Sequence, residues 1–236
     1  MSGARSEEAF RPAAALGPVL ATEDGVTAVR LARRALEASL APHPTEDPAT
    51  TVQKERLPPV FDEPRGVFVT LKRFPGGALR GCIGYPLPVL PLRSALVGAA
   101  VSAALEDYRF RPVAASELPR LSIEVSVLTP PVPLTFSTPE EALRAVKVGR
   151  DGLIVDGFGS SGLLLPQVAP EEGWSAEELL NGTCEKAGLP PRSWQDPRVR
   201  VRRFEAEIFR EVAPGGDVVR EAPAGATSGG PPARRK

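Results

Sequence analysis

The chain has 236 residues, and its 29 Lys and Arg balance 29 Asp and Glu, which gives a formal net charge of zero. A chain of this length can bury a full core, and the balanced charge excludes a global cationic field that would draw it to nucleic acid or a membrane surface. Two cysteines and one histidine exclude a disulfide-rich scaffold and a cysteine zinc cluster, so we predict no metal and no cofactor. No run approaches the roughly 18 apolar residues of a membrane span, so we expect no membrane partner and a cytoplasmic location.

The composition also bears on redox state and temperature. Cys82 and Cys184 are the two cysteines, and we expect two separate thiols because disulfides are rare in a reducing cytosol. The chain has one Asn, one Met and 27 prolines, and the proline share is about twice the usual one. These are mild signs of adaptation to heat, which we treat as a hypothesis.

The N-terminal part predicts one helix between two irregular segments. Residues 1–21 mix Ala, Pro and Gly and are interpreted as a poorly ordered lead. Asp24 is a suitable cap for an amphipathic helix that runs to Leu40. Residues 41–64 are rich in proline and predict a loop, which holds His43. His43 is a catalytic base or ligand in one interpretation; we favour a solvated loop histidine, because a base must be held by packing.

A hairpin and a helix follow. Residues 66–72 are β-branched and aromatic, residues 74–77 form a turn, and residues 78–84 return as the partner strand. Residues 92–105 are alanine-rich, and small side chains favour a helix that packs closely on the sheet.

The return strand carries the best functional lead, the stretch 79–85 with the sequence Leu-Arg-Gly-Cys-Ile-Gly-Tyr. Strand alternation predicts that Arg80 and Cys82 project from the same face. Residues 121–128 alternate apolar and polar residues and predict another strand. If that strand lies near the motif, its Glu124 could pair with Arg80 and orient it.

A proline-rich break at residues 129–133 suggests a subdomain boundary. Thr138 then caps a short helix, and residues 153–155 and 163–165 predict a second hairpin. The loop between them, residues 157–162, matches the dinucleotide-binding glycine pattern. That pattern requires a helix to begin at the loop, and a strand follows here, so we interpret the loop as a hairpin tip.

The last elements are a helix and a strand. Residues 167–173 predict a loop, and Ser175 opens a helix with a capping box. Cys184 lies on the apolar side of this helix and is interpreted as a buried structural thiol. Residues 199–209 predict one strand, whose change of apolar phase suggests a bulge near residues 202–203.

Cys82 remains the candidate for chemistry. A cysteine near Arg80 at a strand end could act as a nucleophile or redox centre. The alternative is that Cys82 is the largest side chain that fits a crowded turn, and we favour this structural interpretation because buried inert cysteines are common. A Cys–His pair would need His43, which lies in a predicted loop with no packing to hold it in place.

Several motifs together resemble the AMMECR domain family, in particular its stand-alone archaeal members. The resemblance covers about residues 22–212, and residues 107–110 depart from it, with Tyr where the family typically has Pro. The motifs that carry it, in chain order, are Gly66-Val-Phe-Val-Thr-Leu, Leu79-Arg-Gly-Cys-Ile-Gly, Ile123-Glu-Val-Ser-Val-Leu, Lys147-Val-Gly-Arg-Asp-Gly-Leu, Gly162-Leu-Leu-Leu-Pro-Gln-Val and Lys186-Ala-Gly-Leu.

This resemblance implies an α+β fold, with an antiparallel β-sheet flanked by α-helices and a larger plus a smaller subdomain. We place the family domain at residues 22–212 and its smaller subdomain at about residues 133–175, followed by a disordered tail at residues 213–236. The resemblance also implies a cleft near the Cys82 motif, but no established activity.

Two functions stay open from the sequence. The first is a small-ligand-binding protein or an enzyme, with Cys82 as the catalytic candidate and Arg80, Gly81, Gly84 and Glu124 as ligand-binding candidates. The alternative is a non-catalytic module that binds a protein or nucleic acid, although the net charge does not indicate nucleic acid.

Overall fold

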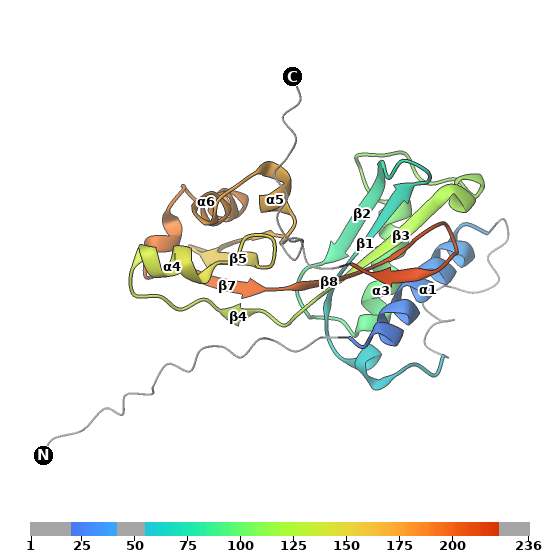
Figure 1. The fold of residues 1–236 in the computed structure, drawn as a ribbon, viewed down its shortest axis with the longest axis horizontal. Coiled ribbons are helices and arrows are strands. Elements are labelled where there is room, and N and C mark those ends of the chain that lie inside the picture. Colours follow the sequence, from blue (N-terminus) through green and yellow to red (C-terminus); the bar gives the residue numbers. More distant parts are fainter. Residues whose placement is uncertain (1–19, 42–54, 222–236) are drawn as a thin grey trace, which may run out of the picture.

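The computed structural model describes residues 20–41 and 55–221. They form two lobes, each built on its own antiparallel sheet with helices packed against it (Figure 1). The larger lobe has a five-stranded sheet in the order β2-β1-β3-β8-β9, and the smaller lobe has a four-stranded sheet in the order β4-β7-β5-β6. The α+β prediction, with a larger and a smaller part, is therefore confirmed.

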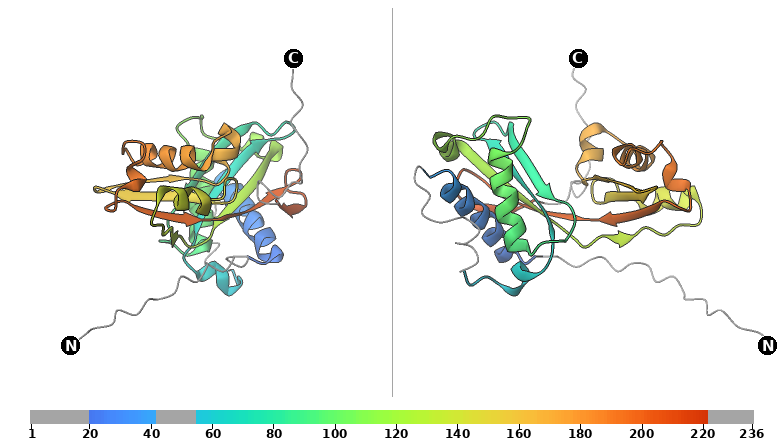
Figure 2. Two further views of the ribbon diagram at one scale, coloured as in Figure 1. Left: turned by 60° about the vertical axis from the view of Figure 1, so that its left-hand side comes forward. Right: turned by 180° about the vertical axis from the view of Figure 1, so that it is seen from behind.

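In the larger lobe, α1 and α3 cover one face of the sheet (Figure 2). Alternation along the strands turns apolar side chains such as Val69, Ile123 and Val125 towards these helices, where they are fully buried. The opposite face is free of α1 and α3. The elements of this lobe are α1 (Thr22–Ser39), η1 (Pro59–Asp62), β1 (Gly66–Arg73), β2 (Leu79–Tyr85), α3 (Leu92–Leu105), η2 (Ala115–Arg120), β3 (Leu121–Leu128), β8 (Ala206–Glu211) and β9 (Val218–Arg220).

The smaller lobe has a separate core, which includes Leu153, Leu179 and Trp194. Its helices begin where the sequence predicts, because Thr138 accepts a hydrogen bond from the Glu141 amide and Ser175 forms a capping box with Glu178. The elements of this lobe are β4 (Val132–Pro133), α4 (Pro139–Ala145), β5 (Gly152–Gly157), β6 (Ser160–Leu164), α5 (Val168–Glu172), α6 (Ala176–Lys186), η3 (Ser193–Gln195) and β7 (Arg200–Phe204).

The glycine-rich loop is the tip of the β5–β6 hairpin. Phe158 and Gly159 both adopt positive φ, at 53° and 81°, as a two-residue turn of type I′ requires. No helix begins at the loop, so the interpretation as a hairpin tip is confirmed and the geometry for a dinucleotide is absent from this described segment.

The chain crosses between the lobes at Thr129 and Glu205. The Thr129 amide donates to the Glu205 carbonyl at 2.9 Å, and the Glu205 amide donates to the Thr129 hydroxyl at 2.8 Å. The prediction of one bulged strand at residues 199–209 is wrong, because β7 and β8 belong to different sheets and are separated at Glu205. The smaller lobe consequently runs from residue 132 to residue 204, and its predicted end near residue 175 is too early.

Three boundaries also differ from the predictions. The residue at the cap of α1 is Ala21 rather than Asp24, which lies in the first turn of the helix. Residues 168–172 form α5 where a loop is predicted. β9 lies inside the predicted disordered tail, where it pairs with β8. The lead up to residue 19, His43 and the tail from residue 222 lie outside the described residues.

Cys82 and Cys184 are free thiols, as predicted. Cys184 is fully buried in the core of the smaller lobe, and this burial raises the pKa of its thiol. None of the helices in the part of the chain that the structure describes combines the length and the apolar character of a membrane span. The same residues include no group of three or more His, Cys, Asp or Glu side chains placed to hold a metal ion.

Candidate functional site around Cys82

Cys82 belongs to a row of polar residues that crosses the larger sheet. Directly paired residues on neighbouring strands place their side chains on the same face. This face is the one opposite α1 and α3, because Leu71 and Ile123, which alternate with the row, face those helices. The row, called the polar row below, is Cys82 on β2, Thr70 on β1, Glu124 on β3 and Arg210 on β8.

The Cys82 sulfur accepts a hydrogen bond from the Thr70 hydroxyl at 3.3 Å, and the residue is partly exposed. The smaller lobe packs against the next row of the same face, where Phe68, Leu163 and Leu165 all pack against the buried cluster of Leu128, Ile154 and Phe204. Cys82 therefore lies close to the junction of the lobes, on the surface that the smaller lobe leaves open.

The backbone of Cys82 is held from outside the sheet. Its amide donates to Asp107 Oδ2 at 2.9 Å, and its carbonyl accepts from Arg109 Nη2 at 3.2 Å. β2 is an edge strand, and the N–H and C=O of one residue in an antiparallel strand point to the same side. The Asp107–Arg109 pair thus takes the place of a neighbouring strand and covers the edge at this position.

Asp107 and Arg109 stay charged over a wide pH range. Arg109 donates to Asp107 from Nε at 2.9 Å and from Nη2 at 2.7 Å, while the Asp107 side chain is only 2% exposed. The hydrogen bonds from Arg109 hold the pKa of Asp107 far below its ordinary value, outweighing the opposing effect of burial. The same bonds raise the pKa of Arg109. The pair is a permanent ionic clamp at neutral pH.

Arg80 has an architectural position. Its side chain is 5% exposed, and Nε and Nη2 each donate to Glu117 at 2.9 Å in a bidentate pair. Arg80 lowers the pKa of Glu117 to about 2. The guanidinium also lies 6.0 Å from the centre of the Phe110 ring. Arg80 therefore fixes η2 and the loop before it against β2.

The expected pairing of Arg80 with Glu124 is wrong. Glu124 instead accepts a hydrogen bond from Lys72 Nζ at 2.6 Å. β1 lies between the strands of Arg80 and Glu124 and supplies this nearer partner.

A register irregularity also separates Arg80 from Cys82. Gly81 pairs with Leu71 while Leu79 pairs with Lys72, so Arg80 is the extra residue of a bulge. The alternation that predicts a shared face for Arg80 and Cys82 is interrupted there. Arg80 meets η2, and Cys82 meets Thr70.

The two glycines of the motif have a packing role. A Cβ atom on Gly81 would lie 2.0 Å from the Ala103 carbonyl of α3, and one on Gly84 would lie 2.3 Å from the Val67 carbonyl. Only glycine permits these approaches. Contact of either glycine with a ligand stays a prediction.

A depression of about 380 Å³ lies at the far end of the polar row. Its lining includes Lys72, Glu124, Arg210 and Glu221, which carry alternating charges. Lys72 pairs with Glu124, and Arg210 pairs with Glu221. This depression is thus polar and of mixed charge, and it is not lined by Cys82 or Thr70.

Sequence reasoning missed four residues of this site: Thr70, Asp107, Arg109 and Glu117. The signal for the loop residues was present, since charged and aromatic residues are concentrated at positions 106–112. Their partners in the motif strand are 25 or more positions away in the chain, so local patterns could not assign those pairs.

Comparison with known proteins identifies the family. The AMMECR1 family model matches residues 29–209. The chain belongs to the AMMECR1 family. The resemblance predicted from the motifs is therefore confirmed, and the family segment includes both lobes.

Two archaeal relatives illustrate the similarity. A protein of Thermococcus gammatolerans is 53% identical over 202 residues, which is 84% of this chain and 96% of the relative. Protein MJ0810 of Methanocaldococcus jannaschii is 47% identical over 201 residues, which is 85% of this chain and 96% of the relative.

The crystal structure of the uncharacterized protein PH0010 from Pyrococcus horikoshii is also similar. It has a TM-score of 0.74 at 48% sequence identity and covers 86% of this chain and 98% of its own. The names of these relatives state no activity, so the function has to be argued from the site.

Proposed function

We propose that this AMMECR1 protein binds a small polar ligand on the open sheet face, with Cys82 Sγ and Thr70 Oγ1 in contact with it. The observation that carries the proposal is that every polar atom of Cys82 has a fixed partner. Asp107 holds the amide, Arg109 the carbonyl and Thr70 the sulfur. A side chain so positioned and still partly exposed is preorganised for contact with a ligand.

The contrast with Cys184 supports a role beyond packing. Cys184 is fully buried among apolar side chains, as is usual for a structural thiol. Cys82 instead faces Thr70 on the polar face and is partly exposed. This polar, partly exposed environment distinguishes Cys82 from the structural thiol of Cys184.

The charges near the polar row indicate the class of ligand. Lys72, Glu124 and Arg210 present both signs within one depression. A small zwitterion or a molecule with several donors and acceptors complements such a surface better than an apolar one.

The proposal is of binding, and we assign no reaction. Asp107 and Glu117 are locked in ion pairs that lower their pKa values, which makes them poor general bases near neutral pH. Their contacts instead suit them to hold the site in shape.

Alkylation of the full-length folded protein tests the site. We expect iodoacetamide at neutral pH to modify Cys82 and to leave Cys184 unmodified, as read by peptide mass spectrometry. We further expect at least one free amino acid, used at millimolar concentration as a zwitterionic probe, to slow the modification of Cys82. Thr70→Val keeps the shape of the side chain and should weaken this protection.

Negligible and equal labelling of both cysteines would remove Cys82 from the role of an accessible contact. Labelling of Cys82 that no zwitterion slows would contradict the proposed ligand class. Thermal unfolding of Thr70→Val provides the control that its fold is retained.

One observation favours the alternative, a docking surface for another protein. Tyr108 is 93% exposed, although it lies between the two clamp residues Asp107 and Arg109. If docking is the function, Tyr108→Ser should abolish capture of a partner and leave the protection of Cys82 by amino acids unchanged. If ligand binding is the function, substitutions in the polar row should change the protection of Cys82 by amino acids.

A further inference from the structure

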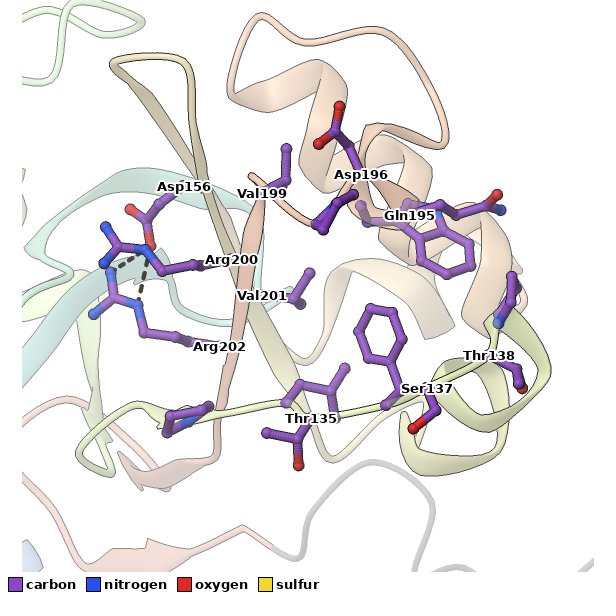
Figure 3. Close-up of a pocket in the computed structure, with 16 residues that line it drawn as sticks. Thr135, Ser137, Thr138, Asp156, Gln195, Asp196, Val199, Arg200, Val201 and Arg202 are labelled. Atoms are coloured by element: carbon purple, nitrogen blue, oxygen red, sulfur yellow. Dashed lines mark hydrogen bonds and ion pairs between the residues drawn. The ribbon is translucent and has the colours of Figure 1, made fainter. Parts of the chain in front are cut away.

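The smaller lobe contains a groove of about 690 Å³ that is separate from the polar row (Figure 3). It follows the outer edge of β7 on one side and the segment 133–139 on the other, and η3 closes one end. β4 is the edge strand of this sheet and pairs with β7. The groove lies beside β7, beyond the point where its pairing with β4 ends.

β7 has an incompletely paired edge. β4 covers it only where Val132 pairs with Arg203 and Pro133 with Arg202. One further bond, from the Leu134 amide to the Val201 carbonyl at 2.9 Å, ends the ladder before the chain turns towards α4. The Val201 amide and the Val199 carbonyl point to the same side of β7 as the Val201 carbonyl. In the described segment 135–138, no backbone group bonds to them.

The two sides of this edge differ in chemistry. Arg200 and Arg202 project from one face of β7, and Val201 projects from the other, as Figure 3 shows. On the apolar side, the Phe136 ring lies edge-on to Trp194 with 6.0 Å between ring centres. A chain lying along this edge would meet cationic and apolar surroundings at alternate residues.

One positive charge in the groove is uncompensated. Arg202 is paired with Asp156 at 2.8 Å, and the neighbouring Arg198 is paired with Asp196 at 2.7 Å. Arg200 is exposed and has no ion pair among the described residues. An acidic group is the natural complement of Arg200.

We propose that β7 accepts an extended peptide of another protein as an added strand beside residues 199–201, with an acidic side chain towards Arg200 and apolar side chains towards Phe136. Main-chain hydrogen bonds to an open strand edge supply affinity in this mode, and alternate side chains supply specificity. The recognised pattern is therefore a short run in which acidic and apolar residues alternate. This site is independent of ligand binding at Cys82.

Fluorescence anisotropy with the full-length protein tests the proposal. The probe is a fluorescein-labelled Glu-Val-Glu-Val-Glu peptide, and the comparison peptide is Lys-Val-Lys-Val-Lys. We expect the acidic peptide to bind and the basic one not to bind. Arg200→Glu should weaken the acidic peptide by at least about tenfold and let the basic peptide bind. Arg192→Glu makes the same change in net charge elsewhere on this lobe and should have little effect.

A second peptide separates strand addition from attraction between charges. Methylation of the peptide nitrogens removes donors while it keeps the charges, so it should abolish binding. Equal binding of the methylated peptide, or displacement of the probe by inorganic phosphate at low concentration, would show a simple anion site and overturn the proposal. Failure of the acidic peptide to bind would overturn it as well. Thermal unfolding of both arginine variants checks that they are folded.

Discussion

Asp107 accepts the main-chain N–H of Cys82 across 2.9 Å from a loop that lies outside the sheet. The family motif therefore owes its shape to a carboxylate 25 positions further along the chain. Arg109 completes the arrangement by binding both Asp107 and the Cys82 carbonyl. The clamp makes specific predictions about stability and its dependence on pH.

Replacing Asp107 by Asn should destabilise the protein by about 2–3 kcal/mol at neutral pH. The substitution removes a charge-assisted pair with Arg109 and leaves a buried hydrogen-bond network incomplete. The measurement is the free energy of unfolding from urea titration. Arg192→Ala, at an exposed ion pair, is the control and should change stability by less than about 1 kcal/mol.

The effect of Asp107→Asn should depend on pH. Because folding lowers the pKa of Asp107, its charge stabilises the folded state fully above the unfolded pKa of about 4 and progressively less below it. The difference in unfolding free energy between the native protein and Asp107→Asn should thus shrink as the pH falls below about 4. A difference that stays constant down to acid pH would contradict the clamp.

Arg80→Lys should destabilise the protein even though the charge is kept. Lysine cannot reproduce the two parallel hydrogen bonds to Glu117, and we expect a loss of about 1–3 kcal/mol. Glu117 has its pKa lowered from 4.5 to about 2, so its contribution should be lost as the pH falls through that window. A double-mutant cycle with Glu117→Gln measures the coupling.

Cys82 labelling distinguishes an architectural Arg80 from a ligand-binding one. The measurement uses conditions in which Arg80→Lys is fully folded. If Arg80 is architectural, a zwitterion should protect Cys82 from alkylation in this variant as well as in the native protein. Loss of protection at unchanged stability would instead place Arg80 in contact with the ligand.

Gly81→Ala should be far more damaging than its small change in volume suggests. The added Cβ atom would lie 2.0 Å from the Ala103 carbonyl, and backbone of a packed helix cannot move away cheaply. We expect a loss of about 3 kcal/mol or more, measured as a shift of the urea midpoint. Leu79→Ala, in the same strand but 40% exposed, should cost less than about 1.5 kcal/mol.

Phe158→Asn should stabilise the β5–β6 hairpin. Phe158 adopts a φ of 53°, which asparagine tolerates better, and the change creates the Asn-Gly pair that type I′ turns favour. We expect a gain of about 0.5–1 kcal/mol after allowance for the contact of Arg198 with the Phe158 ring at 4.7 Å. Thermal unfolding of Phe158→Asn in the Arg198→Ala background isolates the backbone effect. Reduced stability in that background would contradict it.

Local rules predicted the parts of the fold that depend on neighbours in sequence. Hydrogen-bonding side chains at Thr138 and Ser175 start the two helices because their partners lie three residues away. The hairpin tip at residues 158–159 follows from turn chemistry in the same way. The apolar phase change near residues 202–203 predicted a bulge, but it arises because Val201 packs in the core of the smaller lobe while Phe204 packs in a different cluster with Leu128 and Ile154.

The candidate site was less predictable because its geometry depends on distant pairs. The bulge at Arg80 changes the face of the sheet from which the side chain projects. The alternation of apolar and polar residues in the sequence does not reveal a single irregularity of this kind. Glu117 and Glu124 are both acidic, so composition alone could not select the partner of Arg80. Register and loop packing decided that choice.

The bonds between Thr129 and Glu205 also describe how the protein is built. β3 and β8 are adjacent antiparallel strands, and the smaller lobe occupies the whole stretch of chain between them. The smaller lobe is therefore an insertion in a β-hairpin, with its entry and exit side by side. A short turn that joins residue 129 directly to residue 205 would close the hairpin without displacing either strand. The larger sheet is in this sense complete without the smaller lobe, and the groove on β7 lies entirely within the inserted segment.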